Sequence, residues 1–286
     1  MSDNYEIGTG ISREPRLAVL IDAENISASY CKAMMAEIAR YGIPTIKRIY
    51  GDWARPNLSS WKQHLLDFGI VPVQQFGYTL GKNSTDSTLI IDAMDLLYQN
   101  KPDGFCLVSS DSDFTRLAQR LREAGKIVYG FGEEKTPNPF IASCDRFVYL
   151  EILTREYNRE QRRLYDEEGG HEQSAEAKHG EADTTVAAAY QPAAGSVGSG
   201  ARELDSRVLN FLRSSVSDLA DETGGWAFLG DVGNLLVNKQ PSFDPRNYGF
   251  QKLTPMFRAA GIFDIDERAT GNRNVKHVYI RIKEGM

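Results

Sequence analysis

The sequence has little cysteine and histidine, and it has no long hydrophobic run. The 286 residues include three cysteines (Cys31, Cys106 and Cys144), which lie far apart and form no CxxC pair. This spacing favours neither a disulfide framework nor a zinc knuckle. No apolar run approaches the roughly 20 residues of a membrane-spanning helix, and the first ten residues, MSDNYEIGTG, lack a signal-peptide pattern. We therefore expect a soluble, cytoplasmic protein without a membrane partner.

The chain also lacks an excess of basic residues, which by itself argues against a nucleic-acid partner. Its formal net charge is −6, but that charge is unevenly distributed. Residues 16–155 are neutral, residues 156–200 carry −5, residues 201–286 carry +1, and the first 15 residues carry −2. Most of the excess acid is therefore in one middle segment.

This distribution predicts two folded domains joined by a linker. The middle segment is poor in large aliphatic residues and rich in Glu, Ala, Gly and Ser, so it cannot bury enough apolar area to offset chain entropy. We expect a disordered head over 1–15, a first domain over 16–153, an acidic flexible linker over 154–202 and a second domain over 203–286. The start of the linker has the composition of a polar helix.

The first domain alternates short apolar runs with segments of helical periodicity. This order predicts an α/β three-layer sandwich with a parallel sheet, of the Rossmann-like kind, covered by helices on both faces. Ligands of such sheets bind beyond the carboxyl ends of the strands. The expected strands are 17–22, 45–52, 70–76, 105–110, 126–132 and 147–151.

The second domain has a different order of elements. An amphipathic helix over 203–219 precedes a short strand and a helix within 225–239, and 248–261 reads as a helix interrupted by Pro255. Two strands, 262–267 and 275–283, then flank a turn. This plan is that of a small α+β winged helix, in which the third helix and the wing often contact nucleic acid.

Four carboxylates of the first domain are predicted to meet at one edge of the sheet. Asp22 ends the first strand, Asp111 and Asp113 follow the fourth, and Asp86 begins the helix after the third. Carboxylates that converge repel one another unless a cation or a shared proton intervenes, and oxygen ligands favour Mg²⁺ or Mn²⁺ over zinc. A cation held there can activate water against a phosphodiester. For each Asp alone, helix capping is the competing interpretation, with Asp113 as the cap of the helix that follows.

Other polar residues near this edge are further candidates for the site. Asn25 either contacts substrate or water, or caps the helix that begins near Ser27. Lys82 either neutralises a substrate phosphate or is an ordinary surface lysine. Arg55 and Trp53 follow the second strand, where basic and aromatic side chains can pair and stack with single-stranded RNA. Asp92 lies about 240° around the helix from Asp86 and therefore supports the site or faces solvent.

Three segments of the first domain carry a family resemblance. LIDAENI, KNSTDSTLIID and LVSSDSDFTRL resemble the motifs of NYN domains, in the LabA-like branch of the PIN-like nucleases, over residues 15–152. The resemblance implies a PIN-like α/β/α sandwich and Mg²⁺- or Mn²⁺-dependent ribonuclease activity. The family's metal-binding acids then correspond to Asp22, Asp86, Asp111 and Asp113. Its asparagine corresponds to Asn25, and its small hydroxyl residue corresponds to Ser109.

The second domain carries a resemblance of its own. WAFLGDVGNLL and YGFQKLTPMF resemble the OST-HTH domain, also called LOTUS, over about 203–284. Such domains are linked to single-stranded or structured RNA, and some bind protein helices instead. Residues 246–286 have a net charge of +4, and Arg268, Arg273 and Lys276 around the wing are candidate RNA contacts.

Together the two resemblances imply a metal-dependent ribonuclease whose second domain recruits RNA. Two further hypotheses remain. The chain is a non-catalytic RNA-binding or regulatory adaptor if the acid cluster is idle. It is a DNA-directed or flap-type nuclease if the cluster acts on DNA, because a metal site of this kind reads phosphates and not sugars.

Overall fold

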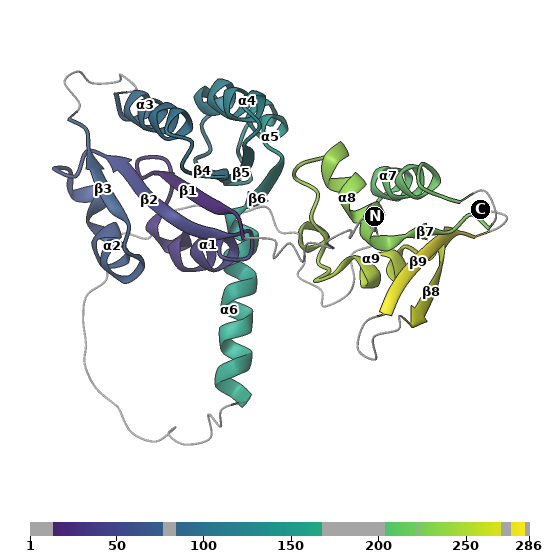
Figure 1. Cartoon of the computed structure of the whole chain (residues 1–286). Helices are drawn as coiled ribbons and strands as arrows, with labels where there is room; N and C mark the ends of the chain where they lie inside the picture. Colours follow the sequence, from purple (N-terminus) through teal and green to yellow (C-terminus); the bar gives the residue numbers. More distant parts are fainter. Residues whose placement is uncertain (1–13, 77–83, 168–203, 222–223, 270–275, 284–286) are drawn as a thin grey trace, which may run out of the picture.

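The computed structural model describes residues 14–76, 84–167, 204–221, 224–269 and 276–283. Within them the chain forms a large α/β domain and a smaller C-terminal domain that lies beside it (Figure 1). In this part of the chain, no helix combines the length and apolar character needed to cross a membrane.

A six-stranded sheet forms the centre of the first domain. All neighbouring strands are parallel, in the order β3-β2-β1-β4-β5-β6, so their carboxyl ends share one edge. The sheet places β1 and β4, which are far apart in sequence, side by side at its centre. The strands are β1 (Arg16–Asp22), β2 (Ile43–Gly51), β3 (Val71–Gln74), β4 (Gly104–Val108), β5 (Ile127–Gly132) and β6 (Arg146–Tyr149).

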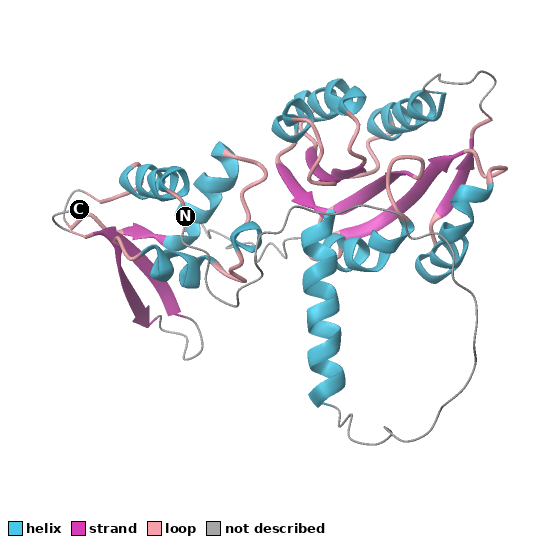
Figure 2. Cartoon of the chain, turned by 180° about the vertical axis from the view of Figure 1, so that it is seen from behind, coloured by secondary structure: helices cyan, strands magenta, loops and turns pink. Residues whose placement is uncertain are grey.

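Helices cover both faces of this sheet, as Figures 1 and 2 show. Alternate β1 side chains supply the two cores: Val19 and Ile21 pack with one set of helices, and Leu20 packs with the other. One set is α1 (Cys31–Ile38), α2 (Lys62–Phe68) and α6 (Leu150–Glu167), and the other is α3 (Ser84–Tyr98), α4 (Thr115–Glu123) and α5 (Asn138–Ser143). The predicted three-layer α/β sandwich is confirmed.

The C-terminal domain contains three α-helices and an antiparallel sheet in its described residues. The sheet order is β7-β9-β8, so a short third strand joins the predicted hairpin. The elements are α7 (Ser206–Ser217), β7 (Ala227–Phe228), α8 (Leu229–Lys239), α9 (Leu253–Ala260), β8 (Phe263–Ala269) and β9 (Lys276–Ile282). This arrangement confirms the winged-helix class.

One helix prediction in this domain is wrong. Residues 248–261 do not form one helix interrupted by Pro255, because α9 begins only at Leu253. Pro255 therefore lies in the first turn, where its missing N–H costs nothing. A separate 3₁₀ helix, Pro245–Tyr248, ends at Gly249 with φ of 86°, a left-handed conformation that glycine adopts without strain.

The segment between α8 and α9 contacts the first domain. Arg246 donates to both carboxylate oxygens of Glu37 (2.7 and 3.1 Å) and also pairs with Asp244. Arg146, the first residue of β6, donates to Asp244 at 3.0 Å. The backbone N–H of Phe147 donates to the carbonyl of Pro241 and so pairs part of the exposed edge of β6.

The linker predicted over 154–202 overlaps the structured first domain. Helix α6 continues to Glu167, and its beginning packs against α1. Residues 168–203 lie outside the described part of the chain, as do residues 1–13 of the predicted head.

We predict that Arg246→Ala destabilises the protein by about 3–5 kcal/mol, because it removes the buried cation that Glu37 and Asp244 share and leaves them only the more exposed Arg40 and Arg146. The side chains of Arg246 and Glu37 are only 10% and 6% exposed. Equilibrium urea unfolding measures the change. Arg258→Ala is the matched control, because Arg258 is 65% exposed and its pair with Glu267 is worth at most about 1 kcal/mol. Equal losses in both variants would contradict the prediction.

Candidate metal centre and nucleic-acid interface

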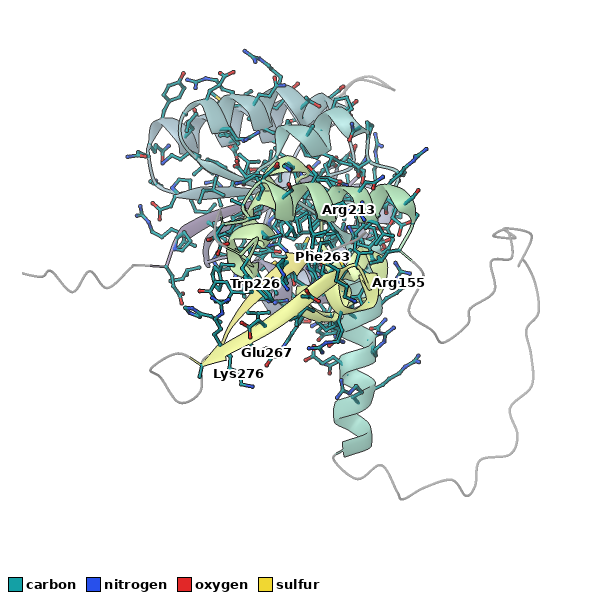
Figure 3. The ribbon with its side chains drawn as sticks, turned by 90° about the vertical axis from the view of Figure 1, so that its right-hand side faces the viewer. Arg155, Arg213, Trp226, Phe263, Glu267 and Lys276 are labelled. Atoms are coloured by element: carbon teal, nitrogen blue, oxygen red, sulfur yellow. The ribbon has the colours of Figure 1, made fainter. Side chains whose placement is uncertain are left out.

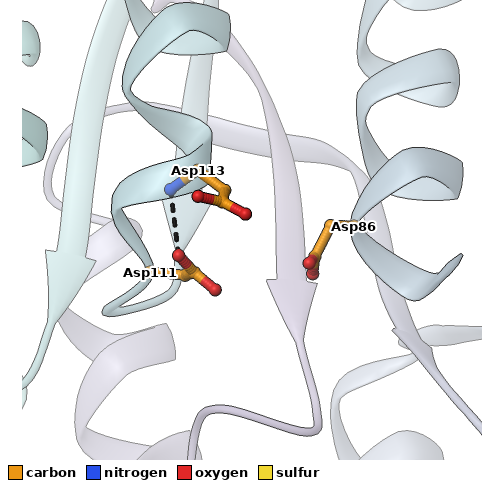
Figure 4. Close-up of side chains that lie close together, drawn as sticks. All are labelled: Asp86, Asp111 and Asp113. Atoms are coloured by element: carbon orange, nitrogen blue, oxygen red, sulfur yellow. Dashed lines mark hydrogen bonds between the residues drawn. The ribbon is translucent and has the colours of Figure 1, made fainter. Parts of the chain in front are cut away.

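The predicted acidic residues lie at the carboxyl edge of the central strands. Asp22 is the last residue of β1, and Asp111 follows β4, the strand that pairs directly with β1. Asp86 is in the first turn of α3, and Asp113 lies in the 3₁₀ helix Ser112–Phe114. Figure 4 shows Asp86 facing Asp111 and Asp113 from a different element.

Three of these carboxylates form a cluster. Oxygen atoms of Asp86, Asp111 and Asp113 all lie within 4.8 Å of one another. The capping interpretation holds for Asp111, whose side chain accepts the N–H of Asp113 at 2.9 Å and caps the 3₁₀ helix. It is wrong for Asp113, because the N-cap residue of α4 is Phe114. Asp113 contributes its carboxylate to the cluster from the first turn of that helix.

Asp22 lies beside the cluster rather than within it. Its side chain is buried and accepts hydrogen bonds from the Ser109 hydroxyl (3.0 Å) and from the backbone N–H groups of Glu24 and Asn25. The pKa of Asp22 is raised to about 6: burial and the charge of Asp86 raise it, and the hydrogen bond from Ser109 lowers it. Asp22 and Asp86 therefore interact electrostatically.

The electrostatics of Asp86 favour a bound cation. Burial, then the charges of Asp111 and Asp113, raise the pKa of Asp86 to about 6 from its ordinary value of 3.8. A cation between these groups offsets both the desolvation and the mutual repulsion. The donors are all carboxylate oxygens, which fit the hard cations Mg²⁺ and Mn²⁺.

Ser109 and Asn25 connect the loops that carry the acids. Ser109 Oγ donates to Asp22 and accepts the N–H of Asp111 at 3.1 Å, so one hydroxyl links two of the carboxylate positions. Asn25 Oδ1 accepts the N–H of Ser110 at 2.8 Å. The side chain that caps the following 3₁₀ helix is that of Ser27, not Asn25. Asn25 therefore ties the loop after β1 to the loop after β4.

The remaining candidates of the first domain pair with other residues or lie outside the described residues. Asp92 accepts bonds from Arg48 (2.8 Å) and from the Tyr50 hydroxyl (2.9 Å), so it serves the packing of α3 on β2. Arg55 is half exposed and pairs with Asp52. Lys82 lies outside the described residues.

The wing cations are already paired with carboxylates. Arg268 pairs with Asp266 at 2.9 Å and lies over the ring of Tyr279, 4.0 Å from its centroid. Lys276 pairs with Glu267 at 3.2 Å, and Figure 3 labels both residues on the hairpin. Arg273 lies outside the described residues.

Sequence reasoning did not single out Trp226 and Tyr279, whose rings pack with the wing arginines. Arg268 and Arg281 both lie over the Trp226 ring, at 5.6 and 4.7 Å from its centroid. The alternation of His277, Tyr279 and Arg281 along β9 was the available signal, because residues two apart share a face of a strand.

Family models match both parts of the chain. The model of the NYN domain matches residues 16–151, and that of the OST-HTH/LOTUS domain matches residues 201–275. No curated protein matches the sequence. NYN domains are PIN-like nuclease domains and OST-HTH/LOTUS domains are linked to RNA binding, so a nuclease-type and an RNA-binding-type domain lie in one chain.

Several solved structures are similar in part. A protein of unknown function from Vibrio parahaemolyticus is 18% identical, with a TM-score of 0.41, over 48% of this chain and 94% of that one. An uncharacterized protein from Nitrosomonas europaea is 30% identical, with a TM-score of 0.26, over 36% and 95%. A protein from Chromobacterium violaceum is 29% identical, with a TM-score of 0.24, over 30% and 88%.

We predict that Asp86→Asn raises the melting temperature of the metal-free protein at pH 8. A carboxyl whose pKa rises to about 6 on folding contributes stability that is complete below pH 4 and is lost as pH rises through 6. The gain in the variant should therefore be large at pH 8 and small at pH 4. Thermal unfolding in EDTA measures it.

Mn²⁺ at pH 8 should raise the melting temperature of the wild type but not of Asp86→Asn, because the variant lacks a charged ligand. Asp95→Asn, at an exposed position of the same helix, is the matched control and should behave as wild type in both conditions. A lower melting temperature for Asp86→Asn at pH 8 in EDTA would show that the charged Asp86 carboxylate does not destabilise the folded protein.

Proposed function

Because the chain carries an NYN domain followed by an OST-HTH/LOTUS domain, we propose that it is a divalent-metal-dependent ribonuclease that hydrolyses RNA phosphodiester bonds. The C-terminal domain recruits the RNA. The observation that carries the proposal is the cluster of Asp86, Asp111 and Asp113 at the carboxyl edge of the sheet, where ligands of parallel α/β sheets bind.

The residues of the cluster fit a metal site for phosphoryl chemistry. Asp86, Asp111 and Asp113 would hold Mg²⁺ or Mn²⁺, with Asp22 beside them as a further acid of the site. When bound, such a cation polarises the phosphodiester and lowers the pKa of a water molecule. Without it the acids repel an RNA backbone, which is why activity should depend strictly on metal.

Ser109 and Asn25 have positioning roles in this proposal. Ser109 holds Asp22 through its hydroxyl and fixes the backbone of Asp111. Asn25 holds the backbone of Ser110, so it sets the distance between the two acidic loops. These contacts keep carboxylates from separate strands close together despite their repulsion.

The test is cleavage of an end-labelled single-stranded RNA. The wild type should cleave it with Mn²⁺ or Mg²⁺ and stop in EDTA, and Asp22→Asn and Asp111→Asn should fall to background. Ser109→Ala should retain activity reduced by about 10- to 100-fold, as expected for a residue that orients a metal ligand. Asp95→Asn should cleave as wild type. Matched single-stranded DNA should be cleaved more slowly than the RNA.

Equal residual cleavage in the wild type and both Asn variants would identify a contaminating nuclease and overturn the proposal. Faster cleavage of the DNA would overturn the assignment to RNA while leaving the metal site in place.

A further inference from the structure

The distribution of unpaired positive charge differs from the prediction that the wing binds RNA. On the described part of the wing, Arg268, Lys276 and Arg281 each pair with a carboxylate of β8. A phosphate that approached these cations would also meet Asp266, Glu267 and Asp264. Phosphate binding needs cations whose charge is not already offset.

Such cations border a pocket between the two domains. The pocket has a volume of about 630 Å³ and is formed by the end of α1, by α6 and by the segment before α9. Its walls carry Arg159, Arg163 and Lys252, together with Arg40, which pairs with Glu37. Among the residues that the structure describes, no ion pair involves Arg159, Arg163 or Lys252, and all three are exposed.

Most of the carboxylates that line the pocket pair with Arg246. Glu37 and Asp244 are buried, and both bind Arg246. Arg246 binding holds the pKa of each below its ordinary value although burial raises it, so both remain charged and paired. Glu156 is 27% exposed and also faces Arg246, which leaves Glu160 as the exposed carboxylate of the lining.

The side chains that solvent can reach are therefore mainly cationic. Arg40 is 69% exposed and contacts Glu37 through one nitrogen, and Arg146 is 31% exposed. Arg159 and Arg163 are four residues apart, so they lie on the same face of α6, one turn from each other. Cations from both domains that surround one concave surface focus a positive potential there.

We propose that this interdomain pocket binds the phosphodiester backbone of single-stranded RNA. The proposal rests on the proposed function in that the ligand is RNA, and it moves the main phosphate contacts from the wing to the junction of the domains. Because α6 and the segment before α9 both supply cations, bound RNA also ties the domains together. Charge complementarity favours this occupant, since exposed cations from both domains line the pocket and RNA carries a phosphate at every nucleotide.

The test compares two variants that lose the same charge. Arg159→Gln/Arg163→Gln/Lys252→Gln removes the pocket cations, and Arg268→Gln/Arg273→Gln/Lys276→Gln removes the wing cations. Fluorescence anisotropy of a labelled single-stranded RNA, in EDTA so that no cleavage occurs, gives the affinity at several salt concentrations. The five of these positions that the structure describes, Arg159, Arg163, Lys252, Arg268 and Lys276, are exposed. Circular dichroism verifies that both variants fold.

The pocket variant should bind roughly 10- to 100-fold more weakly at physiological salt, and the slope of log K against log salt should fall by about 2 in magnitude, for three lost contacts to a single strand. The wing variant should stay within about twofold of wild type. Equal losses in the two variants, a larger loss in the wing variant, or unchanged binding of the pocket variant would each overturn the proposal.

This result is independent of catalysis. Asp95→Asn, at an exposed position of α3 outside both the pocket and the acidic cluster, should bind the RNA as the wild type does. If the wild type does not cleave RNA but the pocket variant loses affinity, the proposed ribonuclease activity is wrong and the proposed binding site is supported. If the wild type cleaves RNA and the pocket variant binds normally, the opposite holds.

Discussion

Parallel pairing between β1 and β4 is the constraint on which the candidate site depends. The two strands are separated by more than 80 residues, yet their pairing brings the end of β1 beside the loop that follows β4. Ser109 and Asn25 then bridge these two loops through hydrogen bonds to Asp22 and to the backbone of Ser110 and Asp111. Asp86 enters from α3, whose first turn lies at the same edge. The fold thus forces carboxylates together against their own repulsion.

That repulsion has a direct chemical consequence. Asp22 and Asp86 both have pKa values raised to about 6, by burial first and then by neighbouring charge. At neutral pH these carboxylates are charged and repel one another, so a bound cation stabilises the folded state most there. The ligand atoms are all carboxylate oxygens, which fit Mg²⁺ or Mn²⁺. The acidic cluster of the otherwise neutral first domain is in this respect consistent with the proposed metal dependence and is not an argument against a nucleic-acid partner.

The second constraint is the junction between the domains. Arg246 is bound to Glu37 from one domain and Asp244 from the other, and the Phe147 N–H extends the pairing of the edge strand. A guanidinium can satisfy two carboxylates at once because its donors lie in a fixed plane. With these acids neutralised, the cations at the rim of the interdomain pocket determine its charge.

The sequence by itself determined the α/β class, the order of elements and the edge where the acids lie, because apolar periodicity and strand ends are local signals. It also determined the family resemblances of both domains, since these reside in short contiguous motifs. Tertiary structure decided that Asp111 caps the 3₁₀ helix after β4, that Asp22 lies beside the cluster, and that Arg268 and Arg281 of the wing are paired with carboxylates. The pairing of Glu37 with Arg246, 209 positions apart, is also visible only in the tertiary structure. Such a contact depends on how the elements pack and produces no periodic pattern in the sequence.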